Sequence, residues 1–257
     1  MRVLVTGAAG FIGSNLAAEL LRRGHEVVGL DNFSQGSPLN LETVERDPGF
    51  SLHRADIRDA EAVTTAAEGC HAVVHLAAFK IPRYDDAYET LMINGFGSEI
   101  VAQVAARTGA KVVAASTSDV YGKNPDVPFA EEMDSVIGGP HVKRWAYAVS
   151  KMFEEQLLLA CHERFGIDVV LLRFFGGYGP NQNLTWWGGP QAVFIEKALD
   201  GEPLPLHGDG SQTRTFTHVS DHVAGIVAAL ESNGADNLVV NLGSREETSI
   251  RALAELI

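Results

Sequence analysis

The stretch "TGAAGFIG", residues 6–13, decides the fold that we expect of this chain. It follows the apolar run "RVLV" and opens a segment of helical spacing that stops at Gly24. Gly7, Gly10 and Gly13 allow a tight turn and a close approach of the backbone to a pyrophosphate, and a helix start offers free N–H groups with a partial positive charge. The plain alternative is a tight turn that packs a helix. The order strand, glycines, helix favours a dinucleotide-binding turn.

Short apolar runs alternate with helical segments through the first two thirds of the chain. Further strand-like runs occupy residues 26–31, 50–56, 71–78, 110–117 and 167–175, and helical stretches lie at about 59–68 and 86–108. Buried strands that alternate with helices are typical of a parallel sheet with helices on both faces. The sequence therefore predicts an α/β fold, a Rossmann-type doubly wound parallel sheet.

The texture of the sequence changes after Phe175. Residues 176–190, "GGYGPNQNLTWWGGP", are rich in Gly, Pro and aromatic residues, which is typical of a functional loop. The sequence next predicts a helix at about 191–200 and a short strand at 203–208. A helix from about Ser220 and a strand at 237–243 follow. The segment from Ser249 is amphipathic up to the last residue and has no C-terminal cap, so we expect a truncated chain.

The sequence divides into four segments, whose tasks are those that the family resemblance given below implies. We expect a Rossmann domain that binds NAD (1–175), a segment of a smaller substrate-binding cap (176–219), a return to the Rossmann domain (220–245) and the start of an incomplete C-terminal cap (246–257).

Composition narrows the class of protein. The 257 residues are 46% hydrophobic, enough for a sizeable core, and 33 acidic against 20 basic residues give a net charge of −13. An acidic surface argues against a nucleic-acid or anionic-membrane partner. Cys70 and Cys161 match no metal spacing, so we expect no metal site and free thiols in a cytoplasmic protein. No apolar run reaches the length of a membrane span.

Asp31 ends the second predicted strand. A carboxylate at that place in a dinucleotide-binding unit accepts hydrogen bonds from the adenosine ribose hydroxyls and repels a 2′-phosphate, which favours NAD over NADP. A solvated loop acid is the alternative.

The stretch "YAVSK", residues 147–151, sets Tyr147 and Lys151 on one face of a predicted helix. A free tyrosine has a pKa of ~10, and both a nearby ammonium and a positive nicotinamide ring favour its phenolate. An amphipathic tyrosine beside an exposed lysine is the alternative. "STSDVYG", residues 116–122, follows the fifth predicted strand, where hydroxyl and carboxylate groups face ligands of open α/β sheets. A polar turn is the alternative there.

Together these motifs resemble the extended short-chain dehydrogenase/reductases of the NAD-dependent nucleotide-sugar epimerase/dehydratase group. The resemblance covers the whole chain and includes four more motifs: "ADIRD" (55–59), "HLAAFK" (75–80), "LRFFGGYGP" (172–180) and "RTFTHVSD" (214–221). It implies an NAD cofactor, a nucleotide-diphosphate sugar as substrate, with a UDP-sugar favoured, and a homodimer that pairs the helices at about 86–108 and 145–165. Ile100, Val104, Leu157 and Leu158 are apolar residues of those helices.

The resemblance also implies site residues. Contacts to the cofactor are expected from the glycine turn with Phe11 and Ile12, and from Asp31, Asn32, Asp56, Ile57, Ala77, Ala78, Lys80, Asn94, Tyr147 and Lys151. The catalytic group would be Thr117, Asp119, Tyr147 and Lys151, and the substrate would contact Ser118, Arg144, Gln191, His207 and Arg214. The sequence departs from the family pattern at Gly176, where an Asn is usual, and at Pro190–Gln191, near another usual Asn. Both departures concern the sugar.

All members of this group would begin by oxidising the sugar at C4. A 4-epimerase needs the fewest extra groups and is the reaction we expect. A 4,6- or 5,6-dehydratase, a UDP-glucuronic acid decarboxylase and a catalytically silent NAD-binding sensor stay as alternatives. The usual Asp-Glu pair of the 4,6-dehydratases is Ser118 and Asp119 here, and "RWAYAVSK" (144–151) comes close to the decarboxylase pattern. Arg144 or Arg214 could hold a substrate carboxylate.

Overall fold

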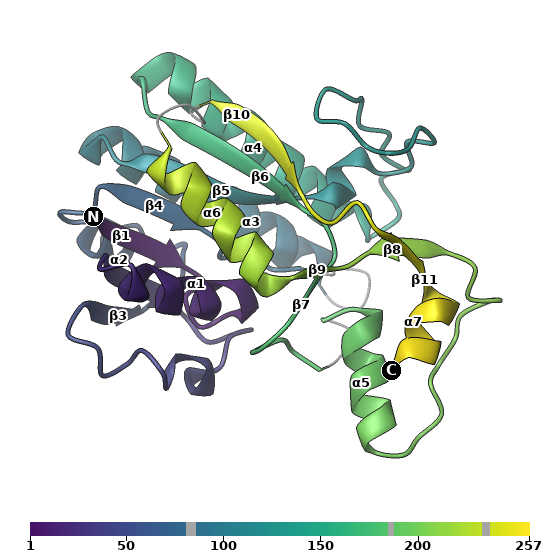
Figure 1. The fold of residues 1–257 in the computed structure, drawn as a ribbon. Coiled ribbons are helices and arrows are strands. Elements are labelled where there is room, and N and C mark those ends of the chain that lie inside the picture. Colours follow the sequence, from purple (N-terminus) through teal and green to yellow (C-terminus); the bar gives the residue numbers. More distant parts are fainter. Residues whose placement is uncertain (81–85, 185–187, 233–236) are drawn as a thin grey trace.

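A seven-stranded parallel sheet forms the body of the molecule (Figure 1). The structure is a computed structural model that describes residues 1–80, 86–184, 188–232 and 237–257. The strands follow the order β10-β6-β5-β4-β1-β2-β3. Their bounds are β1 Arg2–Thr6, β2 Glu26–Asp31, β3 Phe50–Arg54, β4 Ala72–His75, β5 Lys111–Thr117, β6 Val169–Phe174 and β10 Leu238–Leu242. The predicted α/β, doubly wound parallel sheet is confirmed.

Helices cover both faces of this sheet. On one face lie α1 (Phe11–Arg22) and α6 (Val219–Glu231), and on the other lie α2 (Ala60–Ala66), α3 (Ala87–Thr108) and α4 (Trp145–Phe165). Strands β1, β4 and β6 carry runs of apolar residues that are almost wholly buried, as expected of strands covered on both faces. Every strand pairing in the sheet is parallel, so the carboxyl ends of the strands share one edge.

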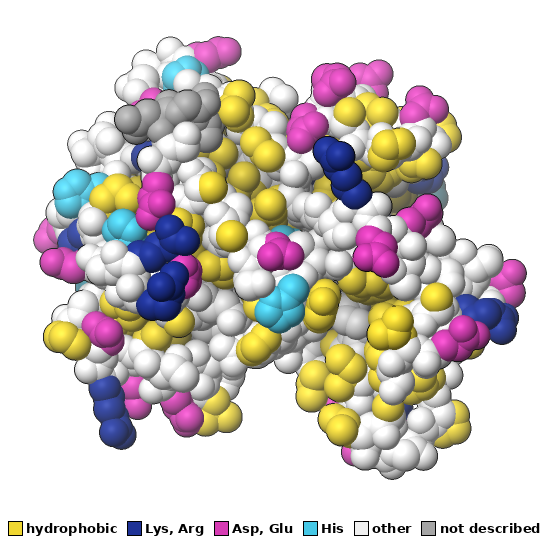
Figure 2. Space-filling model, viewed as in Figure 1, with side chains coloured by type: hydrophobic (Ala, Val, Ile, Leu, Met, Phe, Trp, Pro, Cys, Tyr) yellow, Lys and Arg dark blue, Asp and Glu magenta, His cyan; other side chains and the backbone are white. Residues whose placement is uncertain are grey.

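A smaller lobe lies beyond that edge (Figure 1). Helix α5 (Pro190–Leu199) packs on α7 (Ile250–Leu256) around a small core formed by Phe194, Ile250 and Leu253. Strand β8 (Thr213–Thr215) pairs antiparallel with β11 (Glu247–Ser249), and Arg214 stands opposite Thr248. Residues from the two predicted cap segments, 176–219 and 246–257, thus lie together. Apolar side chains gather on the surface of this smaller lobe in Figure 2, and Leu199 and Leu256 are the most exposed of them.

Some elements differ from the prediction. The strand predicted at 203–208 is absent, because Pro203 and Pro205 lack the N–H that a ladder needs. The predicted loop 176–190 contains the short strand β7 (Gly177–Tyr178), which pairs with β9 (Thr217–His218), and its residues 185–187 lie outside the described part. Short 3₁₀ turns, η1 (Pro38–Leu41) and η2 (Ser118–Tyr121), were not predicted.

Two of the four apolar residues named for helix pairing between subunits are not at the surface, so naming them for that contact was wrong. Val104 and Leu158 are buried in this chain's own core, because α3 and α4 lie side by side and turn those positions toward the sheet. Ile100 and Leu157 are partly buried against the same core. The thiols of Cys70 and Cys161 are buried and unpaired. In the described ranges, no helix has both the length and the hydropathy to cross a bilayer.

A buried ion pair fastens α4 to the sheet. Arg173 of β6 donates to both carboxylate oxygens of Glu155, from Nε at 2.9 Å and from Nη2 at 2.7 Å, and Ser116 of β5 donates to the same carboxylate. The third nitrogen of the Arg173 guanidinium, Nη1, donates to the hydroxyl of Tyr121 at 2.9 Å. The fork geometry satisfies both charges inside the protein.

Arg173→Met should lower the free energy of unfolding by about 3–5 kcal/mol, because it leaves the Glu155 carboxylate buried without its cation. The matched control is Arg22→Met, which removes an arginine whose side chain is 69% exposed from a pair with Glu19 and should cost less than about 1 kcal/mol. Urea unfolding followed by circular dichroism measures both. Equal losses in the two variants would contradict this account of how α4 is held.

Candidate active site

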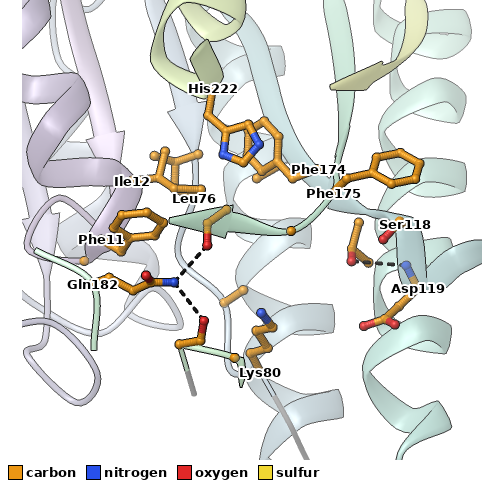
Figure 3. Close-up of a pocket in the computed structure, with 18 of the residues that line it drawn as sticks. Phe11, Ile12, Leu76, Lys80, Ser118, Asp119, Phe174, Phe175, Gln182 and His222 are labelled. Atoms are coloured by element: carbon orange, nitrogen blue, oxygen red, sulfur yellow. Dashed lines mark hydrogen bonds between the residues drawn. The ribbon is translucent and has the colours of Figure 1, made fainter. Parts of the chain in front are cut away.

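A cavity of about 520 Å³ opens at the carboxyl ends of the strands, between the sheet and the smaller lobe. Its walls come from the glycine turn, from the ends of β4, β5 and β6, from α4 and from residues 175–177, 182–183, 188–191 and 214–216. In Figure 3, Phe11 and Ile12 lie toward one end of the cavity, Ser118 and Asp119 lie toward the other, and Lys80 lies between them. The cavity therefore spans from the predicted dinucleotide turn to the predicted reacting groups.

The glycine turn is built for close approach. Gly7 has a φ of +72°, which favours glycine, and a Cβ there would lie 2.9 Å from the Ala77 nitrogen. A Cβ on Gly13 would lie 2.1 Å from the Gly7 oxygen, so only glycine lets α1 start this near the turn. The first N–H groups of a helix have no acceptor within it, and Gly10, Phe11, Ile12 and Gly13 line the cavity. These features fit the pyrophosphate of a dinucleotide.

Asp31 lies at the end of β2 beside this turn. Its Oδ2 accepts from the Ala9 N–H at 2.9 Å and its Oδ1 from the Phe33 N–H at 2.7 Å. Burial raises the pKa of the Asp31 carboxyl, and the two backbone hydrogen bonds oppose that rise. Asn32 donates to Asp56 at 3.0 Å, which places the ends of β2 and β3 together. Asp31 thus contacts the glycine turn through Ala9, but none of these three side chains lines the cavity itself.

Tyr147, Thr117 and Lys151 line the cavity together. Tyr147 is half-buried in the first turns of α4 and forms a hydrogen bond with the Thr117 hydroxyl. Burial raises the pKa of the Tyr147 hydroxyl well above its usual range, the carboxylates of Asp119 and Glu154 raise it further, and the Thr117 contact opposes them. The lowered pKa expected beside Lys151 does not arise in the chain by itself.

Lys151 is buried and paired. Its Nζ donates to the Ala115 carbonyl at 2.7 Å and to Glu154 Oε2 at 2.8 Å. An ammonium has three donors, so one N–H of Lys151 is left for the cavity. The alternative of an exposed surface lysine is thereby excluded, since its side chain is 1% exposed.

The end of the cavity opposite the glycine turn carries mixed charge. The Asp119 carboxylate and the Arg144 guanidinium lie 3.8 Å apart, both about half exposed, and Arg144 also stacks over the Trp145 ring. Arg214 enters from β8, and Gln191 donates to the Gly177 and Gly188 carbonyls at 2.7 and 2.8 Å. Gln191 therefore binds the loop backbone.

The structure brings most of the predicted site residues to one cavity. Those that line it are Gly7, Gly10, Phe11, Ile12, Gly13, Ala78, Lys80, Thr117, Ser118, Asp119, Arg144, Tyr147, Lys151, Gln191 and Arg214. Those that do not are Asp31, Asn32, Asp56, Ile57, Ala77, Asn94 and His207. Asn94 is buried, and its side-chain amide accepts from the Phe79 N–H and donates to the Phe79 carbonyl. Ile57 is buried against Gly97. No group of His, Cys, Asp and Glu in the described ranges is arranged to hold a metal ion.

Comparison with known proteins agrees with this geometry. The model of the NAD-dependent epimerase/dehydratase family matches residues 3–243. The chain belongs to that family. Its relatives are NAD-dependent nucleotide-sugar epimerases, dehydratases and decarboxylases, and this family member is an enzyme of the same class, with NAD as its cofactor.

Three proteins illustrate the relation. The UDP-N-acetyl-alpha-D-glucosaminuronate decarboxylase of Bacillus cytotoxicus is 37% identical over 99% of this chain and 78% of its own. The UDP-glucuronic acid decarboxylase 1 of Xenopus tropicalis is 36% identical over 100% of this chain, which spans only 59% of that protein. The crystal structure of UDP-glucuronic acid 4-epimerase from Bacillus cereus, with UDP-glucuronic acid and NAD, has a TM-score of 0.88 at 32% identity and covers 98% of this chain and 80% of its own.

The sequence did not point to three residues of this family member's cavity region. Gln182 donates to the Gly177 and Gly188 carbonyls at 2.8 and 2.7 Å, next to Gln191. His222 lines the cavity and stacks on Phe174, with ring centroids 5.0 Å apart. Glu154 binds Lys151 from behind. Glu154 follows Lys151 by three positions on a helix, a spacing that marks neighbours and was the available signal.

NAD should bind this protein ~10-fold or more tightly than NADP, because Asp31 would face the added phosphate and like charges repel. Asp31→Asn keeps the size of the side chain and removes its charge, so it should lower the ratio of NAD affinity to NADP affinity. Asp31→Ala should lower the same ratio. Calorimetric titration with both cofactors measures the two affinities needed for each protein. Equal binding of NAD and NADP by the parent would remove Asp31 from this role.

Proposed function

We propose that this protein is a UDP-sugar 4-epimerase in which Tyr147 removes the proton of the sugar C4 hydroxyl. The observation that carries the proposal is the joint presence of Thr117, Tyr147 and Lys151 at the sugar end of a cavity whose other end is the glycine turn. When bound, NAD⁺ would supply the acceptor for the C4 hydride, and the NADH so formed would be the donor to the opposite face of the 4-keto sugar.

The residues around the sugar have distinct tasks in this proposal. The Tyr147 phenolate accepts the C4 proton and, as a phenol, returns a proton to the alkoxide at the end. The Thr117 hydroxyl orients the same sugar oxygen, and the remaining N–H of Lys151 donates to the cofactor ribose. Arg214 binds the diphosphate through its guanidinium. Access of water is limited by the smaller lobe, against which the cavity lies.

Epimerisation is favoured over dehydration by what surrounds the cavity. A dehydratase needs an acid and a base besides Tyr147, and at the two positions after Thr117 this chain offers a hydroxyl, Ser118, and one carboxylate, Asp119. Asp119 lies 3.8 Å from the Arg144 guanidinium, and this single carboxyl group does not supply both the acid and the base.

Decarboxylation of a UDP-uronic acid is the second candidate. Arg144 stands at the cavity wall beside Asp119, where a guanidinium could bind the C5 carboxylate of a uronic acid. Relatives at 36–37% identity carry the names of decarboxylases that act on such sugars. A 4-keto uronic acid loses CO₂ with electrons flowing to the ketone, so the same first oxidation would serve.

A panel of UDP-, GDP-, CDP- and dTDP-sugars that includes UDP-glucose, UDP-N-acetylglucosamine and their uronic acids separates these reactions. Products are analysed by mass spectrometry and NMR. An unchanged mass with inverted C4 supports epimerisation, loss of CO₂ supports decarboxylation, and loss of water supports a dehydratase. Binding of NAD without turnover of any sugar would favour the silent sensor.

We also propose a homodimer through α3 and α4. The outer surface of these helices has an apolar groove of about 330 Å³ between Leu91, Phe96, Val149 and Phe153, which are 42–50% exposed. Large apolar side chains gathered in one exposed patch are typical of interaction surfaces. The neighbouring Gly95 also lines this groove.

Tyr147→Phe should lower turnover by at least ~100-fold while it keeps the fold and NAD binding, because it deletes only the group that moves the proton. Lys151→Met should lose activity and some NAD affinity together. Tyr178→Phe, which alters a tyrosine outside the cavity lining, is the matched control and should keep full activity. Initial rates and calorimetry measure these effects. Parent-like turnover by Tyr147→Phe would refute the proposed base.

Light scattering at micromolar concentration should give twice the 27.6 kDa mass of the chain. Phe96→Glu with Phe153→Glu should give the monomer mass, since two carboxylates cannot be buried unpaired in the interface. Phe165→Glu is the control, as Phe165 is 52% exposed but lies outside the groove. A monomeric parent would exclude this dimer.

A further inference from the structure

Lys151 and Glu154 form an ion pair that is closed off from solvent. Both side chains are 1% exposed, and Nζ of Lys151 lies 2.8 Å from Oε2 of Glu154. The two residues stand three positions apart on α4, so one helix turn fixes their approach. The negative charge of Glu154 thus lies directly behind the ammonium that lines the cavity.

Other buried groups hold this carboxylate in place. Ser98 of α3 donates to Oε2 of Glu154 at 3.0 Å, and the same hydroxyl lies 3.1 Å from Nε2 of His75. Nδ1 of His75 lies 2.8 Å from the hydroxyl of Thr6 at the end of β1. Burial lowers the pKa of His75 to about 4, so this imidazole is neutral near neutral pH and adds no charge. Glu154 is therefore the one anion of this chain of contacts.

Stability does not explain the pair. A buried ion pair contributes little net stability unless its remaining polar atoms are satisfied. Oε1 of Glu154 is buried and has no hydrogen-bond partner among the described residues. The next residue, Glu155, contrasts with it, because Arg173 binds both of its oxygens. Glu154 is thus held for its effect on Lys151 at some cost to the fold.

The pair changes what Lys151 does to Tyr147. An isolated ammonium in the cavity wall would favour the phenolate, but an adjacent carboxylate offsets that charge. In the chain by itself the pKa of Tyr147 is raised, first by burial and then by the carboxylates of Asp119 and Glu154. A further positive charge at the cavity would favour the phenolate of Tyr147.

We propose that Glu154 is a positioning residue that holds the Lys151 ammonium and offsets its charge, so that Tyr147 ionises only when the cationic nicotinamide of NAD⁺ is bound. The inference rests on the proposed role of Tyr147 as the base. When NAD⁺ binds, the Tyr147 proton passes to solvent. With NADH, which lacks the ring charge, Tyr147 keeps its proton.

The other charged groups near Tyr147 are accounted for. Asp119 faces it from η2 and is paired with Arg144 at the start of α4, while the buried pair of Glu155 and Arg173 is closed on itself. Each of these pairs keeps its net charge when Glu154 is changed. Glu154→Gln therefore adds one net positive charge to the surroundings of Tyr147, and Glu154→Asp adds none.

The first test is the pH dependence of kcat/KM. Activity should rise as Tyr147 loses its proton, and in Glu154→Gln that rising limb should lie about one pH unit lower, because the phenolate loses a neighbouring negative charge. Glu154→Asp keeps the charge but shortens its reach to Lys151, so its limb should match the parent's while kcat falls at least ~10-fold. Glu155→Gln, the neighbouring control, should unfold at a lower temperature with an unshifted limb.

The second test needs no turnover. Calorimetry in two buffers of different ionisation enthalpy counts the protons released when NAD⁺ binds. At the midpoint of its rising limb the parent should release about half a proton, Glu154→Gln more than the parent, and Tyr147→Phe none. Binding of NADH should release none in any of these proteins.

The outcomes separate this inference from the proposed function. If Tyr147→Phe releases as many protons as the parent, or turns over substrate normally, the proposed base is wrong. Suppose that Tyr147→Phe behaves as expected, and that a folded Glu154→Gln has the parent's rising limb of kcat/KM against pH and the parent's proton release. Only the role of Glu154 is then overturned. Should Glu154→Gln not fold, parent-like kcat in Glu154→Asp would overturn the positioning role.

Discussion

The pairing of charges on the inner face of α4 is the constraint on which the site depends. Lys151, Glu154 and Glu155 are all buried on one helix, and burial of a charge is tolerated only when a partner meets it. Glu155 finds Arg173 on the sheet, and Lys151 finds Glu154 and the Ala115 carbonyl. These contacts fix the rotation of α4 about its axis and so bring Tyr147 to the cavity wall beside Thr117.

The sheet edge supplies the other half of the arrangement. All seven strands run the same way, so their carboxyl ends present the glycine turn, Asp31 and Thr117 at one side of the molecule. Gly7 and Gly13 then bring the start of α1 as near as backbone atoms allow. A dinucleotide laid along this edge would reach from the β2 end to α4. The cavity in Figure 3 holds the part of that path between the glycine turn and the residues Ser118 and Asp119.

Much of this could be predicted from sequence, because strong local patterns carry it. The glycine turn, the buried strands and the spacing of Tyr147 and Lys151 all depend on neighbours in the chain. The buried ion pairs of α4 could not be predicted from the sequence, since an acidic residue three positions after a lysine is usual on a solvated helix face. Only packing against Arg173 and the Ala115 carbonyl reveals that this face is internal. Strands β7 and β9, two residues each, are too short to leave a periodic signal.

The antiparallel ladder of β8 and β11 joins two parts of the chain that are far apart in sequence. Arg214, which lines the cavity, is held in register with Thr248, and α7 begins directly after that ladder. None of these residues belongs to the seven-stranded sheet. We therefore expect substitutions in β11 and α7 to move the Arg214 wall of the cavity while Thr117, Tyr147 and Lys151 stay in place. Such substitutions would offer protein engineers a route to a changed substrate preference.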